Sequence, residues 1–300
     1  IKPKEILFGC TGTIGETFPT AKIKNGIPNL IEKIKYNQNK YIWAKAASGM
    51  MTTDLVPKLA MEECKIGNTS IKIYGVAKGS GMIYPNMATT LSFLVTNATL
   101  SNDQCYTFLK EAIDDSLNMV TLDTDTSTND MVLLFSTGEK KFSLNNKEET
   151  SAFQSLMNDA CIDLAKQMAR DGEGASKLIE VTVKGAASKK DARIISKNIV
   201  GSPLVKTAVT AASANWGRLV MAIGKDPNVK VNPNKLTISV GSVVLVRDGV
   251  PLDYDPKEAE KEMSSETVCI TADLNLNKYE ATAWGCDLTK GYVDINTEYN

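Results

Sequence analysis

The most informative gap in this 300-residue sequence is the complete lack of histidine. Ser-His-Asp and Cys-His catalysis are excluded, because both need an imidazole to take the proton of the nucleophile. Zinc sites of the Cys/His type are excluded as well. Any nucleophile in this chain must therefore be activated by a lysine, a carboxylate, a terminal amine or a metal ion.

Long apolar runs and an excess of one charge are also missing. No apolar stretch approaches the ~20 residues of a transmembrane helix, and the opening residues IKPKEILFGC lack the basic lead and apolar core of a signal peptide. The formal net charge is −1, with both signs interspersed. We therefore expect neither a nucleic acid nor a membrane as a partner.

The six cysteines are scattered and form no C-x-x-C pair. A chain of this length does not need disulfide staples, so the thiols are better interpreted as small core residues in a reducing compartment. This predicts a cytoplasmic protein.

The remaining composition is that of a globular protein, with 43% hydrophobic and 23% charged residues. Patterns of period 2 and period 3.6 alternate along the chain without a regular βαβ rhythm, which predicts an α/β fold of the mixed α+β kind. The expected strands lie at 5–9, 71–82 (ending in glycines), 89–100, 131–137, 178–186, 235–249 (a pair), 268–276 and 279–289. The expected helices lie at 56–65, 101–120, 148–170, 188–200, 215–224 and 256–264.

The segment KGSGMIYPNMATTLSF (78–93) is the densest motif. Its glycines and proline make a constrained loop that runs through Ala88 into Thr89, where a β-rich stretch begins. A small residue followed by Thr suits an N→O acyl shift, which would free an N-terminal Thr. Its α-amine, with a pKa of roughly 7.7–8.0, could take the proton of its own hydroxyl and so replace histidine. By spacing alone, a glycine-rich turn feeding an ordinary strand is the simpler interpretation.

Four further features each have a functional and a plain interpretation. KGSG could cradle a phosphate, but it lacks the full P-loop pattern and precedes a strand. CTGTIGE (10–16) could offer amides and a hydroxyl to an oxyanion, or be a turn. Glu173 in DGEGASK (171–177) could meet an ammonium group, or be an exposed acid after a helix. LDTDTSTND (122–130) could bind a cation, but a hydrogen-bonded turn is favoured.

Together these segments resemble the ornithine acetyltransferase (glutamate N-acetyltransferase) family of arginine biosynthesis. The pieces that carry the resemblance occur in the family's order over essentially the whole chain: CTGTIGETFP (10–19), MTTD (51–54), AKGSGMIYPNMATTLSF (77–93), DTSTNDMVLL (125–134), ARDGEGASKLIEVTVKGA (169–186), SPLVKTA (202–208), NWGRLVMAIG (215–224) and WGCDLTKGYVDINTEY (284–299).

The resemblance implies an architecture and a set of residue roles. The fold would be the layered sheets and helices of the self-processing ornithine acetyltransferase type. The precursor would cut itself between Ala88 and Thr89 into an α chain, 1–88, and a β chain, 89–300, which together form one catalytic unit. We expect the α chain to be N-terminally incomplete relative to the family. The implied roles are nucleophile for Thr89, oxyanion donors for Thr11 and Gly12, and substrate binding for Thr52, Lys78, Thr89, Glu173 and Asn296.

The implied reaction moves an acetyl group from N2-acetyl-L-ornithine to L-glutamate through acetyl-Thr89, with no cofactor and no metal. The implied assembly is α2β2 or larger. Acetyl-CoA is a further possible donor. The competing hypotheses are a self-processing aminopeptidase or amidase of similar fold, a nucleotide-binding kinase that uses KGSG, and an inactive binding subunit.

Overall fold

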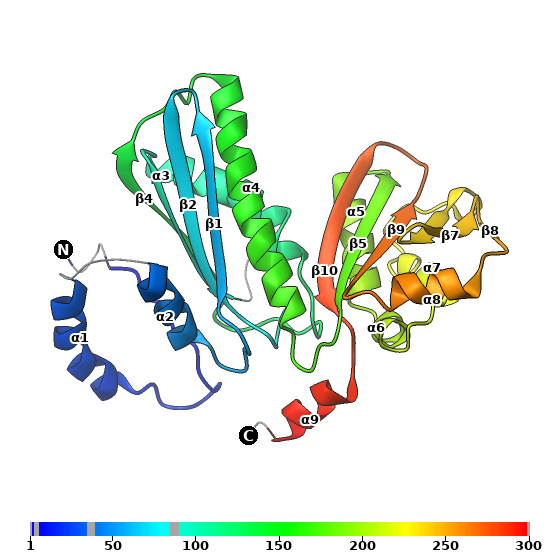
Figure 1. The fold of residues 1–300 in the computed structure, drawn as a ribbon, viewed down its shortest axis with the longest axis horizontal. Coiled ribbons are helices and arrows are strands. Elements are labelled where there is room, and N and C mark those ends of the chain that lie inside the picture. The colour runs from blue at the N-terminus through cyan, green and yellow to red at the C-terminus, as the bar shows by residue number, and fades with distance from the viewer. Residues whose placement is uncertain (1, 3–5, 35–39, 85–89, 299–300) are drawn as a thin grey trace.

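The computed structural model describes residue 2 and residues 6–34, 40–84 and 90–298 of the chain. Two β-sheets stand side by side, and the long helix α4 (Lys147–Arg170) runs between them (Figure 1). The predicted mixed α/β architecture is confirmed.

The first sheet has the strand order β1-β2-β3-β4. Its strands are β1 (Lys58–Ile66), β2 (Thr69–Lys78), β3 (Leu91–Ala98) and β4 (Met131–Lys140). β2 pairs antiparallel with β1 and with β3, whereas β3 and β4 run parallel. The chain crosses from β3 to β4 through α3 (Asn102–Asp114), which begins with a capping box between Ser101 and Gln104.

The second sheet has the order β10-β5-β9-β6-β7-β8. Its strands are β5 (Leu178–Ala186), β6 (Thr237–Val240), β7 (Val243–Arg247), β8 (Val250–Pro251), β9 (Thr267–Asp273) and β10 (Tyr279–Cys286). β5 runs parallel to β9 and antiparallel to β10. The helices of this half are α5 (Lys189–Val200), α6 (Pro203–Thr210), α7 (Trp216–Ile223) and α8 (Pro256–Met263).

Helix α4 joins the two halves into one core. Asn146 caps its first turn, accepting from the amides of Glu148 and Glu149. The apolar stripe predicted from the sequence is buried, and Phe153, which has no exposed surface, stacks edge-on against Phe108 of α3 at 4.8 Å between ring centroids. One hydrophobic cluster extends through both sheets, and α4 packs against β1 and β2 of the first sheet and against β10 and β5 of the second.

Two of the predicted elements are wrong. Residues 56–65, expected to be helical, contain most of β1, which pairs with β2 along its whole length. The side chains of β1 alternate between inward and outward, but Lys58 and Glu62 occupy inward positions. These polar residues hide the period of 2 that marks a strand. In the predicted strand at 5–9, residues 6–9 have no regular structure and no partner strand in the described ranges.

Four helices were not predicted: α1 (Thr20–Ile34), α2 (Lys40–Met50), α6 and α9 (Lys290–Glu298). Helix α2 lies against the first sheet, where Trp43 stacks on Tyr74 at 6.2 Å. Helix α9 follows the end of β10 and lies below both sheets (Figure 1). In the described part of the chain, no helix combines the length and the apolar character of a membrane span.

Candidate functional site

Four of the predicted substrate-binding residues lie in the described ranges, at the same end of the two sheets. They come from the 51–56 loop before β1, the last residue of β2, the 171–177 loop between α4 and β5, and α9. This is the lower end in Figure 1, where α4 stops and α9 begins.

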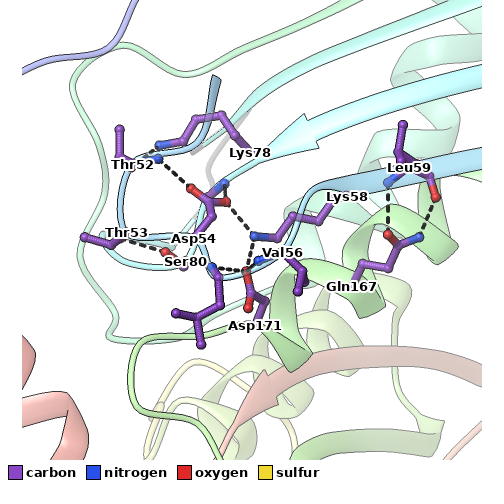
Figure 2. A network of polar contacts seen from close by, with 12 residues as sticks. Thr52, Thr53, Asp54, Val56, Lys58, Leu59, Lys78, Ser80, Gln167 and Asp171 are labelled. Carbon is purple, nitrogen blue, oxygen red and sulfur yellow. Dashed lines mark hydrogen bonds and ion pairs between the residues drawn. The ribbon is translucent and has the colours of Figure 1, made fainter. Parts of the chain in front are cut away.

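Thr52 and Lys78 lie side by side. The Lys78 ammonium donates to the Thr52 hydroxyl oxygen at 3.0 Å, although the two residues are 26 positions apart. Lys78 is the last residue of β2, so the strand fixes its backbone while the side chain reaches across to the 51–56 loop (Figure 2). These two predicted substrate-binding residues are therefore adjacent in space.

The charge of Lys78 is partly desolvated. Burial lowers the pKa of its ammonium below the ordinary value, and the carboxylates of Asp54, Asp130 and Glu173 oppose this by favouring the charged form. A cation with acids close by on three other segments can bind a small ligand that carries both a carboxylate and an ammonium group.

Glu173 and Asn296, two further predicted substrate-binding residues, form a second pair in the structure. The Nδ2 of Asn296 donates to the Glu173 carboxylate at 2.8 Å. That carboxylate lies directly over Gly81, where any side chain would clash with it. The Glu173 amide donates to the Ser80 carbonyl at 2.9 Å. The 171–177 loop is thereby fixed both to the loop after β2 and to α9.

Gly174 brings that loop against the start of α9. Its φ is +66°, in the left-handed region that favours glycine, and an added Cβ would collide with the backbone of Gly291 and Tyr292. The Thr289 hydroxyl donates to the Gly174 carbonyl at 2.6 Å. Burial, with Asp123 and Glu173 adding to it, raises the pKa of Tyr292 to about 12. Glu173 follows the end of α4, as the plain interpretation has it, but it is partly buried and hydrogen-bonded to α9 instead of being an exposed acid.

Thr11 and Gly12 lie in an exposed loop. Residues 10–19 line a cavity of about 300 Å³ together with Thr128 and Asn129. The Asn129 side chain donates to the Cys10 carbonyl, and two residues later the Met131 amide donates to the Thr90 carbonyl at 2.7 Å. The loop is therefore held near the start of β3. Within the described ranges, no hydrogen bond joins Thr11 or Gly12 to the four predicted substrate-binding residues.

Ala88 and Thr89, the predicted cleavage pair, lie outside the described residues. Thr90 is buried and shares a 2.9 Å hydrogen bond with the Ser92 hydroxyl at the start of β3. The expectation that a strand begins directly after Thr89 is consistent with β3 beginning at Leu91.

The remaining motifs have plain roles in the structure. Asp123 accepts from the amides of Ile83 and Asp125, at 2.8 and 3.2 Å, which confirms a hydrogen-bonded turn at 122–130. Burial raises the pKa of Asp123 against these bonds. The Gly79 amide, which a phosphate loop would offer to its ligand, donates to Asp54. Across the part of the chain that is described, His, Cys, Asp and Glu side chains form no group of three suited to a metal.

Three charged residues at this site were not predicted individually. Lys58, which is fully buried, contacts the carboxylates of both Asp54 and Asp171 (Figure 2). Asp54 is the last residue of the MTTD piece, and Asp171 the first of DGEG. An acid two positions from Thr52 and another two positions from Glu173 were therefore visible signals in the sequence, whereas Lys58 lay in a segment predicted to be a helix.

Comparisons with known proteins identify the family. The ArgJ family model matches residues 1–300. A protein of Oceanobacillus iheyensis named arginine biosynthesis bifunctional protein ArgJ is 42% identical over the whole chain, which covers 72% of that protein. A Clostridium acetobutylicum protein named arginine biosynthesis bifunctional protein ArgJ 1 is 41% identical, with 74% of its length covered.

A solved structure is similar as well. The crystal structure of arginine biosynthesis bifunctional protein ArgJ from Bacillus halodurans superposes with a TM-score of 0.64 and 39% identity. The match covers 68% of this chain and 96% of the solved chain. The chain therefore belongs to the ArgJ family, a family of acyltransferase-type enzymes of arginine biosynthesis.

Proposed function

We propose that this enzyme transfers an acetyl group from N2-acetyl-L-ornithine to L-glutamate through an acetyl ester of Thr89. One observation carries the proposal: Thr52, Lys78, Glu173 and Asn296 converge from four separate segments. Lys78 offers a cation to an amino-acid carboxylate, and Glu173 offers an acid to an ammonium group. Both proposed substrates carry these two groups.

The first step of the proposal is self-cleavage. The Thr89 hydroxyl adds to the Ala88 carbonyl carbon, the Ala88–Thr89 C–N bond breaks, and an ester forms while the amine takes the hydroxyl proton. Water then hydrolyses the ester, leaving a carboxylate on Ala88 and a free hydroxyl and α-amine on Thr89. In a chain without histidine, this amine is suited to act as the base for the later steps.

The transfer itself takes two further steps. The Thr89 hydroxyl attacks the acetyl carbonyl of N2-acetylornithine, its proton passes through the α-amine to the leaving nitrogen, and ornithine departs. The neutral amine of glutamate then attacks the acetyl ester and regenerates the Thr89 hydroxyl. Thr11 and the Gly12 amide are the proposed donors to the oxyanion of both tetrahedral intermediates.

The sheet pairing supports an α chain of 1–88 and a β chain of 89–300 that stay together. The cut would fall between β2 and β3, neighbouring antiparallel strands whose register extends from Ile73–Thr96 to Lys78–Leu91. We propose an α2β2 or larger assembly and a cytoplasmic location, the latter supported by six free cysteines.

A second activity, with acetyl-CoA as donor, is favoured by one observation. The relatives that are 41–42% identical are named bifunctional. The same acetyl-Thr89 would then form from a thioester, releasing CoA as its thiol, and glutamate would accept the acetyl group as before.

The test is incubation with N2-acetylornithine, with and without glutamate, following ornithine and N-acetylglutamate. The proposal predicts that the two products form in equal amounts and that sustained ornithine release requires glutamate. Ornithine release indifferent to glutamate, with free acetate as product, would favour the hydrolase. Acetyl-CoA in place of acetylornithine tests the second activity through release of the CoA thiol.

A further inference from the structure

Of the proposed substrate-binding residues, Thr52 and Glu173 lie in loops and Lys78 is the last residue of β2, yet transfer between two substrates requires them to keep fixed relative positions. Below Thr52 and Lys78 in Figure 2 lies a buried group of three charged residues, Asp54, Lys58 and Asp171, which we call the buried charge cluster. Their exposed fractions are 6%, 0% and 8%.

Lys58 lies at the centre of the cluster. Its ammonium donates to Asp54 at 2.5 Å and also to Asp171, 113 positions later in the chain. Lys58 is the first residue of β1, and Asp171 caps the end of α4. A lysine without exposed surface is tolerated because two carboxylates face its charge. The cluster therefore joins the start of β1 to the end of α4.

Asp54 extends the cluster toward Thr52 and Lys78. One carboxylate oxygen accepts from the Gly79 amide at 2.7 Å, and the other accepts from the Thr52 amide at 3.1 Å. Burial alone would raise the pKa of Asp54, but the bonds from Lys58 and from these two amides lower it below its ordinary value. One ionised side chain thus holds the residue Thr52 and the residue that follows Lys78.

Asp171 extends the cluster toward Glu173, two positions along the chain. Its carboxylate accepts from the Leu55 amide at 3.0 Å and the Val56 amide at 3.3 Å. The loop that carries Glu173 is therefore tied to the loop that carries Thr52. The Thr53 hydroxyl adds a link between this loop and Ser80, at 2.7 Å.

We propose that Asp54, Lys58 and Asp171 are positioning residues, which fix Thr52, Lys78 and Glu173 relative to one another for substrate binding. This role rests on the proposed function, because it presumes that those three residues bind the substrates. All three residues of the buried charge cluster are buried. The cluster therefore affects substrate binding only through the backbone of the loops to which it is hydrogen-bonded.

The test compares Lys58→Met with Gln167→Met. Gln167 lies on α4 and bonds both backbone groups of Leu59, at 2.8 and 3.0 Å, so it ties the same helix to the same strand without reaching the loops. Both variants should lower the melting temperature. We expect Lys58→Met to raise KM for both substrates more than tenfold with kcat changed less than threefold, and Gln167→Met to leave KM within twofold.

Hydrogen exchange supplies a readout that does not depend on activity. In Lys58→Met, peptides covering 51–56 and 79–82 should take up deuterium faster, while peptides within 153–165 of α4 should not change. Wild-type KM in folded Lys58→Met, or an equal KM rise in Gln167→Met, would overturn the proposal. Uniformly faster exchange along the chain would also overturn it.

Asp54→Asn serves if Lys58→Met does not fold, because it keeps an acceptor oxygen for Gly79 or Thr52. We expect a three- to tenfold rise in KM, and an unchanged KM would contradict the role. If wild-type enzyme transfers no acetyl group, the proposed function fails, while the exchange comparison still decides whether the cluster fixes the loops.

Discussion

The Asn296 side-chain amide donates to the Glu173 carboxylate at 2.8 Å, across 123 positions of sequence. The bond joins the loop after α4 to the helix after β10, so it closes one side of the candidate site. The Glu173 carboxylate also lies against Gly81, which has no side chain to occupy the space next to it.

Glu173→Gln should weaken binding of N2-acetylornithine. The δ-ammonium of N2-acetylornithine stays charged throughout the proposed reaction, so it can pair with the Glu173 carboxylate at every step. The α-amine of glutamate, in contrast, must become neutral before it attacks. Losing a hydrogen bond to a charged group costs about 1.5–3 kcal/mol, so we expect KM for acetylornithine to rise about 10- to 100-fold and KM for glutamate to change less. Steady-state kinetics with each substrate varied in turn measures this.

The control for that prediction is Glu62→Gln on β1. Burial and the nearby Asp159 and Asp163 raise the pKa of Glu62, so neutralising it removes an unfavourable charge from a residue that is not among the predicted site residues. KM within twofold of wild type is expected. Equal effects of the two substitutions would contradict an ammonium-binding role for Glu173.

Lys197 should make stability depend on pH. Burial lowers the pKa of this α5 lysine to about 8 from 10.5, although its ammonium lies 4.1 Å from the Tyr84 ring centroid. A lowered lysine pKa means that the unfolded chain binds more protons between the two values, so stability rises with pH in that window. At 1.36 kcal/mol per pKa unit, the gain from pH 7 to 9.5 is about 2 kcal/mol.

The measurement is urea unfolding of wild type and Lys197→Met at pH 7 and pH 9.5. The difference between their free energies of unfolding isolates the contribution of Lys197, because the contributions of the other titrating groups cancel. Wild type should gain about 2 kcal/mol relative to the variant as the pH rises. Lys190→Met, on the exposed side of the same helix, is the matched control. A difference between wild type and Lys197→Met that stays constant with pH would refute the prediction.

Phe153→Ala should destabilise the first half of the molecule. Phe153 has no exposed surface and contacts the rings of Phe108 and Phe142 at 4.8 and 5.4 Å. Truncating a buried Phe costs about 3–5 kcal/mol. Tyr106→Ala on α3, where the side chain is 63% exposed, should change the free energy of unfolding by less than about 0.5 kcal/mol. Denaturant unfolding of both variants measures the contrast.

Most of the fold was predictable because its elements carry strong local patterns. Strand β5 has the predicted bounds, and α4 and α5 begin within one residue of prediction, since an Asn and a Ser cap them. β1 was missed because the inward Lys58 is stabilised by two distant carboxylates, which no local pattern reveals. α9 was missed because its surface has no buried residue to give a helical stripe.

The candidate site, like the fold, combines residues that were predictable from the sequence with contacts between distant residues that were not. The resemblance indicated Thr52, Lys78, Glu173 and Asn296, and the structure brings them together as two hydrogen-bonded pairs. The buried charge cluster beneath them arises from long-range contacts and was not predictable from spacing. Thr11 and Gly12 stay predicted oxyanion donors, since the described residues supply a loop and a cavity but no hydrogen bond to the two predicted substrate-binding pairs.

The central claim is that Thr89 is both the self-processing residue and the nucleophile, and the mass of the expressed full-length protein under denaturing conditions tests it most directly. Wild type should give two fragments, the larger beginning Thr-Thr-Leu-Ser-Phe. Thr89→Ala should stay intact and transfer no acetyl group, while Thr89→Ser, which keeps a hydroxyl, should process and act weakly. A single intact chain in an active wild-type preparation, or acetyl transfer by Thr89→Ala, would contradict the account.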